Sequence, residues 1–72
     1  MPYDLTFEQK QAIIEQRLQQ FAAEKFQHEL NLVTAQAIGD TDGEQNANAA
    51  IAQLDTAISV HEQQLAAQGD NA

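Results

Sequence analysis

The acidic segment 40–44 is one place where the sequence could support chemistry, because it carries three carboxylates within five residues. Its position between two long stretches of helix-forming residues invites comparison with an EF-hand calcium loop. When Gly43 is aligned with the invariant glycine of that loop, the first and last ligand positions fall on Ile38 and Ala49, which have no side-chain oxygen. We therefore expect a solvated acidic turn whose binding of divalent cations is at most weak and incidental.

The two histidines are the next candidates, since imidazole serves as a metal ligand or a proton carrier. Both His28 and His61 lie on apolar helix faces, and the hairpin predicted below places His61 opposite Phe21 and His28 opposite Leu54. The two imidazoles therefore do not meet within one chain, and the sequence has no cysteine to add a thiolate ligand. We expect no metal site and no cofactor.

A nucleophile with a partnering base is also missing from the sequence. Ser59 is the only hydroxyl residue within two positions of a histidine, and side chains two positions apart on a helix point in different directions. The chain has no glycine-rich phosphate loop, and its closely spaced carboxylates are confined to the turn. The sequence therefore predicts a protein that is not an enzyme and has no catalytic residues.

The charge balance excludes several partners. The chain carries eleven acids against three bases, Lys10, Arg17 and Lys25, and its net charge is −8. Such a surface repels nucleic acid and anionic membrane, whose recognition depends on Lys and Arg, so we expect neither as a partner. No basic segment followed by an apolar run opens the sequence, so we expect no signal peptide and a cytoplasmic or virion-associated location.

The elements that position these residues are two helices. Residues 6–38 contain no glycine or proline, begin with the capping-box pattern Thr6 to Gln9, and end at Gly39. Residues 39–43 read as a turn, 44–68 as a second helix and 69–72 as a polar tail. We predict one all-α domain spanning 1–72, an antiparallel two-helix hairpin with coiled-coil-like packing.

Apolar residues spaced three and four apart predict which faces are buried. The expected hairpin seam consists of Leu18, Phe21, Leu32, Ile51, Leu54, Ile58 and Leu65. A second apolar stripe on the first helix consists of Ala22, Phe26, Leu30, Val33 and Ala37. Together the two stripes of the first helix cover roughly half its circumference, more than a single neighbouring helix can cover. We therefore expect the hairpin to form oligomers or to dock on a larger protein assembly.

The expected length of the second helix adds a candidate binding surface. In a hairpin folded about Thr41 the second helix runs out near Glu15, and the first helix continues beyond it. The apolar side chains left without an intrachain partner would be Tyr3, Leu5, Phe7, Ile13 and Ile14. Exposed apolar groups gathered in this way mark interaction sites, so we predict that these five bind a protein partner.

Size and composition favour a structural function. A 72-residue chain without cysteine has neither disulfides nor thiolate metal sites to supplement its small core, so association is the remaining means of stabilisation. We expect a small structural or assembly protein that packs helices against itself or a larger protein assembly. Its compact, cysteine-free character is typical of bacteriophage accessory or virion components. The alternative is an acidic inhibitor that occupies a basic nucleic-acid-binding cleft, which the charge favours and the spread of the acids disfavours.

Overall fold

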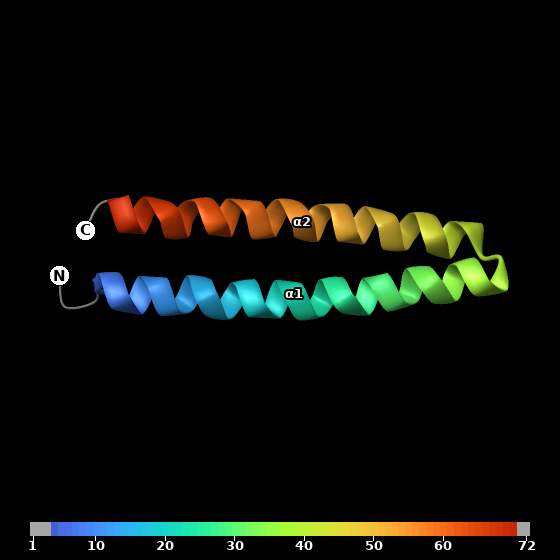
Figure 1. Cartoon of the computed structure of the whole chain (residues 1–72), viewed down its shortest axis with the longest axis horizontal. Helices are drawn as coiled ribbons and strands as arrows, with labels where there is room; N and C mark the ends of the chain where they lie inside the picture. The colour runs from blue at the N-terminus through green and yellow to red at the C-terminus, as the bar shows by residue number, and fades with distance from the viewer. Residues whose placement is uncertain (1–3, 71–72) are drawn as a thin grey trace.

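Two antiparallel helices of similar length make up the described part of the chain. The computed structural model describes residues 4–70, in which α1 spans Phe7–Ile38 and α2 spans Thr41–Asp70. The helices lie side by side and form a long, thin rod (Figure 1). Residues 4–70 contain no strand, which confirms the predicted all-α hairpin.

The boundaries of α1 follow from its capping residues. The Thr6 hydroxyl accepts a hydrogen bond from the Gln9 amide at 3.1 Å, and the Thr6 amide donates to the Gln9 side chain at 2.9 Å. These two bonds satisfy amides that have no partner within the helix. At the other end Gly39 adopts a left-handed conformation with φ of 74°, which glycine tolerates without strain.

The connection between the helices is shorter than the predicted turn 39–43. Gly39 and Asp40 alone separate α1 from α2, and the first residue of α2 is Thr41 rather than residue 44. The reason is that Asp40 caps α2: its carboxylate accepts from the Gly43 amide at 2.9 Å, and its carbonyl accepts from the Glu44 amide at 3.0 Å. Gly43, which indicates a turn in the sequence, instead lies in the first turn of α2.

The open end of the hairpin differs from the prediction because α2 is longer than expected. The register of the two helices is the predicted one at Phe21 and His61, whose rings are in contact. Helix α2 continues through Gly69 to Asp70, where the sequence predicted a polar tail. The two helices consequently end nearly level (Figure 1), so the predicted overhang of α1 beyond α2 is small.

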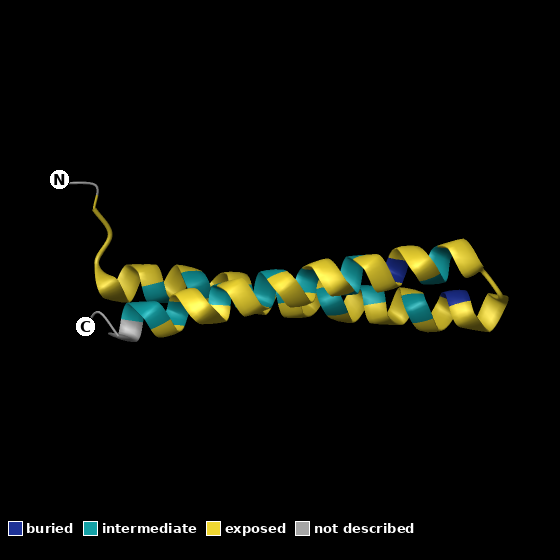
Figure 2. Cartoon of the chain, turned by 90° about the horizontal axis from the view of Figure 1, so that it is seen from above, coloured by how far each residue is buried: buried dark blue, intermediate teal, exposed yellow. Residues whose placement is uncertain are grey.

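The interface between the helices is narrow and largely half-buried. All seven residues of the expected seam (Leu18, Phe21, Leu32, Ile51, Leu54, Ile58 and Leu65) are half-buried. The half-buried parts of both helices lie mainly along the line where the two helices meet (Figure 2). Among the described side chains, only Ala35 and Ala47 are fully buried, at 5% and 4% exposure, and both lie near the turn. Two helices therefore do not by themselves enclose a core of large side chains.

Candidate protein-binding surface

The most prominent unpartnered feature is an apolar stripe on the side of α1 that faces away from α2. We call Phe26, Leu30, Val33 and Ala37 the outer stripe. At 100° per residue it lies roughly 150° around the helix from the seam residues Phe21 and Leu32. Its three large side chains are 59%, 52% and 62% exposed, in chain order. Single exposed apolar residues are normal on a protein surface, but a contiguous row of them indicates an interaction site.

The predicted partner-binding residues at the N-terminal end have different environments. Leu5, Phe7 and Ile13 are exposed. Ile14 is half-buried, because it precedes Phe21 by seven residues and so lies on the same side of α1, toward α2. Tyr3 lies outside the described residues. The exposed apolar residues that remain at this end are therefore Leu5, Phe7 and Ile13. We refer to these three together as the N-terminal patch, with Ile13 about 120° around α1 from Phe7.

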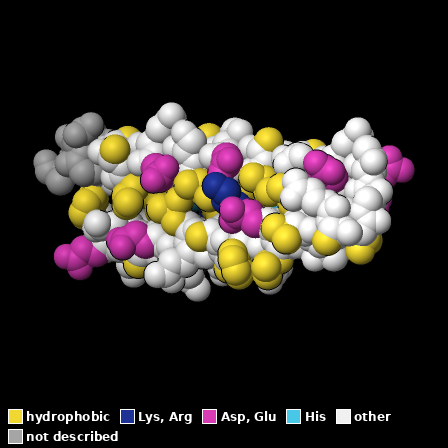
Figure 3. All heavy atoms as spheres, turned by 45° about the vertical axis from the view of Figure 1, so that its right-hand side comes forward, with side chains coloured by type: hydrophobic (Ala, Val, Ile, Leu, Met, Phe, Trp, Pro, Cys, Tyr) yellow, Lys and Arg dark blue, Asp and Glu magenta, His cyan; other side chains and the backbone are white. Residues whose placement is uncertain are grey.

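One edge of the hairpin is acidic. Glu8, Glu15 and Glu29 are spaced by multiples of seven and share one side of α1, while Asp55 and Glu62 share one side of α2. The Lys25 ammonium joins the two helices at this edge through a 2.6 Å ion pair with Asp55. Figure 3 shows acidic side chains from both helices on this face, around a basic side chain at its centre.

The electrostatic effect of this edge is seen at Lys25. The hydrogen-bonded carboxylate of Asp55 holds the pKa of Lys25 above its ordinary value, and Glu29 acts in the same direction from α1. The ion pair is partly open to solvent, since its side chains are 34% and 52% exposed. Exposed ion pairs of this kind contribute little to stability. The acidic edge is therefore mainly a charged surface, and it adds little to the free energy that holds the two helices together.

The two histidines are half-buried and separated along the hairpin. The His61 ring packs edge-on against the Phe21 ring, as the predicted pairing of these residues requires, and its Nδ1 lies 2.7 Å from the Ala57 carbonyl oxygen. His28 lies closer to the turn. Within residues 4–70, no three His, Asp or Glu side chains gather closely enough to hold a metal ion.

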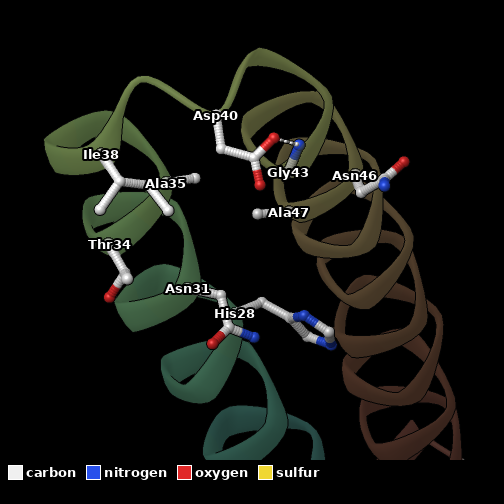
Figure 4. A pocket seen from close by; sticks show the side chains of 9 residues that line it. All are labelled: His28, Asn31, Thr34, Ala35, Ile38, Asp40, Gly43, Asn46 and Ala47. Carbon is white, nitrogen blue, oxygen red and sulfur yellow. Dashed lines mark hydrogen bonds between the residues drawn. The ribbon is translucent and has the colours of Figure 1, made fainter.

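A shallow depression of about 370 Å³ lies between the helices near the turn. In Figure 4 the His28 and Asn31 side chains border it from α1, and Asn46 and Ala47 border it from α2. The depression exists because the small side chains of Ala35 and Ala47 fill little of the space between the backbones. The Asp40 carboxylate is engaged by the Gly43 amide, so it serves as a helix cap in this region.

Three threonine hydroxyl groups form hydrogen bonds within their own helices. The Thr34 hydroxyl donates to the Leu30 carbonyl at 2.9 Å, and the Thr56 hydroxyl donates to the Ala52 carbonyl at 3.1 Å. The Thr6 hydroxyl caps α1. Each of these bonds is local to one helix, so the groups maintain backbone structure and do not converge on a common site.

Comparison of the chain with family models, curated proteins and solved structures finds no match. Neither helix of the described part is long and apolar enough to cross a membrane. A proposal for the function therefore depends on the surfaces of the hairpin: the outer stripe, the N-terminal patch and the acidic edge.

Proposed function

We propose that this protein is a small structural or assembly protein that mediates protein–protein contacts through helical packing. The observation that carries the proposal is the exposure of the outer stripe. Helix α2 covers only one apolar face of α1, so Phe26, Leu30 and Val33 have no intrachain neighbour helix. A helix from another protein chain packed on this face would bury them.

The thin interface within the hairpin supports the same proposal. Small domains usually need disulfides, a metal or association to supplement their core. This chain has no cysteine, and its seam residues are only half-buried. Association would supply the missing apolar contacts, as expected for a subunit of an assembly. The class includes accessory and virion components of bacteriophages, to which the size and composition of the chain are suited.

Sedimentation equilibrium of the full chain at micromolar concentrations tests the proposal. We expect a mass above the 7.9 kDa of one chain. The control is a variant at an exposed polar site on α2, Gln53→Glu, which should associate like the wild type. A stable, fully helical monomer at high micromolar concentration would contradict the proposal.

The acidic edge supports a second candidate function. Five acids lie along one edge of a hairpin with a net charge of −8, and an edge of this kind can imitate the phosphates of a nucleic acid. On this alternative the protein is an inhibitor that occupies a basic nucleic-acid-binding cleft. The test is competition with duplex DNA for a basic DNA-binding protein. Affinity should decrease steeply with salt and in Glu15→Gln/Glu62→Gln, whereas apolar association should depend little on salt.

A further inference from the structure

The outer stripe has a spacing that reads the same in both directions. Its members Phe26, Leu30, Val33 and Ala37 follow one another at steps of four, three and four residues. A second copy of α1 laid antiparallel against the first therefore presents the same spacing at the same heights. Contacts in which one surface patch meets its own copy across a two-fold axis are the usual basis of homodimers.

From this spacing we infer that two copies of the chain pair antiparallel through their outer stripes, with the two-fold axis between Leu30 and Val33. The inference rests on the proposed assembly function and names its partner as a second copy. In this pairing Phe26 faces Ala37 of the second copy, and Leu30 faces Val33 of the second copy. Each layer combines a larger side chain with a smaller one, which keeps the distance between the helices even.

The positions of the acids favour this alignment over its neighbours. Glu29 borders the outer stripe, and in the inferred pairing it faces Gln36 of the second copy. Sliding the copies by one heptad, so that Phe26 faces Leu30 of the second copy, places Glu29 opposite itself. Like charges that face each other oppose association, so the charge pattern selects the first alignment.

The turn acids argue against a parallel pair. Asp40, Asp42 and Glu44 lie within five residues at one end of the rod. Parallel association would bring the two copies of this acidic group together at the same end. Antiparallel association places Asp40 at the height of Ala23 of the second copy, about 25 Å along the helix axis from the Asp40 of that copy. For a chain with a net charge of −8, this separation favours the antiparallel dimer.

The paired segments have a limited length. Overlap from Lys25 to Ile38 covers about 21 Å of helix at 1.5 Å per residue. A standard interface removes about 800 Å² from each partner, about a seventh of the 5423 Å² accessible on this hairpin. The contact would be confined to this part of one helix and to three large exposed side chains, Phe26, Leu30 and Val33. We therefore expect an equilibrium between monomer and dimer that depends on concentration.

The first test is the mass of a variant with a charge in the outer stripe. Leu30→Glu should weaken dimerisation by roughly tenfold or more, because it would bury a carboxylate without a partner. The monomer should keep its helices, since Leu30 is half exposed. The matched control is Val60→Glu, which places the same charge at a 47% exposed site on α2 and should dimerise like the wild type.

The second test determines the relative orientation of the two copies by disulfide cross-linking. The chain has no cysteine of its own that could form competing disulfides. The axes of packed helices are about 8–10 Å apart. Two Cα atoms that face each other across the inferred interface are therefore about 4–6 Å apart, a separation that a disulfide can span. An equimolar mixture of Phe26→Cys and Ala37→Cys chains should therefore yield the mixed disulfide. Disulfides between identical variants should be scarce, because those sites are about 16 Å apart along the helix axis.

The outcomes separate this inference from the proposed function. A monomeric wild type would overturn both. An oligomeric wild type that Leu30→Glu leaves intact would overturn the outer-stripe dimer alone, and another surface such as the N-terminal patch would then hold the assembly. Predominant disulfides between identical variants would show a parallel pair and overturn the antiparallel arrangement. The antiparallel outer-stripe dimer would be established if Leu30→Glu abolishes dimerisation and the Phe26→Cys and Ala37→Cys chains form the mixed disulfide.

Discussion

The His61 ring stands edge-on to the Phe21 ring, with the centroids 4.8 Å apart and the ring planes at 75°. This contact joins the C-terminal third of α2 to the middle of α1. The Arg17 guanidinium lies 5.8 Å from the centroid of the same Phe21 ring. Phe21 is thus the residue at which an aromatic contact between helices and a cation–π contact within α1 coincide.

Phe21→Ala should destabilise the hairpin by about 2 kcal/mol. A fully buried Phe truncated to Ala costs roughly 3–5 kcal/mol, and the half-burial of Phe21 reduces this figure. Leu54→Ala on the opposite helix should have a similar effect. Thermal unfolding followed by circular dichroism measures both, with Val60→Ala as the exposed control. Unchanged unfolding of the two seam variants would contradict the seam assignment.

The pair of rings should also show a measurable coupling. A double-mutant cycle with Phe21→Leu and His61→Gln should give an interaction free energy of about 0.5–1.5 kcal/mol, the usual range for edge-to-face rings. Urea unfolding of the four proteins measures it. Additive effects of the two substitutions would mean that the rings are adjacent without contributing to stability.

Asp40→Ala should lower the free energy of unfolding by about 1 kcal/mol, because it removes the acceptor that caps the first turn of α2. Asp40→Asn is the matched control, since asparagine caps helices about as well and differs in charge. If the two variants unfold alike, the effect of Asp40 arises from its charge and not from the hydrogen bond to the Gly43 amide.

The Lys25–Asp55 pair should stabilise the hairpin in a manner that depends on alkaline pH. The pKa of Lys25 is raised in the folded chain, so its contribution is complete below the unfolded value of about 10.4 and is lost as pH rises through the folded pKa. The melting temperature of the wild type should therefore exceed that of Lys25→Gln near neutral pH, and the difference should shrink above about pH 10.4. A difference that stays constant across this range would argue against the ion pair.

The N-terminal patch is best tested by point substitutions, because deletion through residue 7 would also remove the Thr6 cap. Phe7→Ser and Ile13→Ser change exposed side chains, so the double variant should retain the helicity of the wild type. If the patch binds protein, the assembly measured by sedimentation should become smaller. A loss of helicity would instead show that these residues belong to the hairpin's own core.

The architecture was predictable because its signals are local. The Thr6–Gln9 capping box, the absence of helix breakers and Gly39 define α1 without reference to the rest of the chain. The spacing of Ile51, Leu54, Ile58 and Leu65 likewise identifies the face of α2 that lies toward α1. The width of the apolar arc on α1 indicated in advance that α2 would leave part of it uncovered, and the exposed outer stripe agrees with that expectation.

The turn and the open end could not be predicted from the same signals. Asp40, Thr41 and Asp42 are all good capping residues, and only the folded geometry shows that Asp40 is the one used. Gly43 favours a turn by propensity, but a Cβ atom there would lie 2.5 Å from the Asp40 carboxylate, so this position in the helix suits glycine. The end of α2 was also misplaced, because Gly69 favours a helix end by propensity but α2 continues through it to Asp70.

The concentration of the tightest packing beside the turn has a consequence for how the hairpin opens. Ala35 and Ala47 are buried within a few residues of the chain reversal, where bringing the helices together closes only a short loop. Folding should therefore begin at this end and proceed like a zipper toward the chain ends, with the rapid kinetics of contacts that are local in sequence. Amide hydrogen exchange in the monomer should be slowest around Ala35 and Ala47 and become faster along both helices toward the open end.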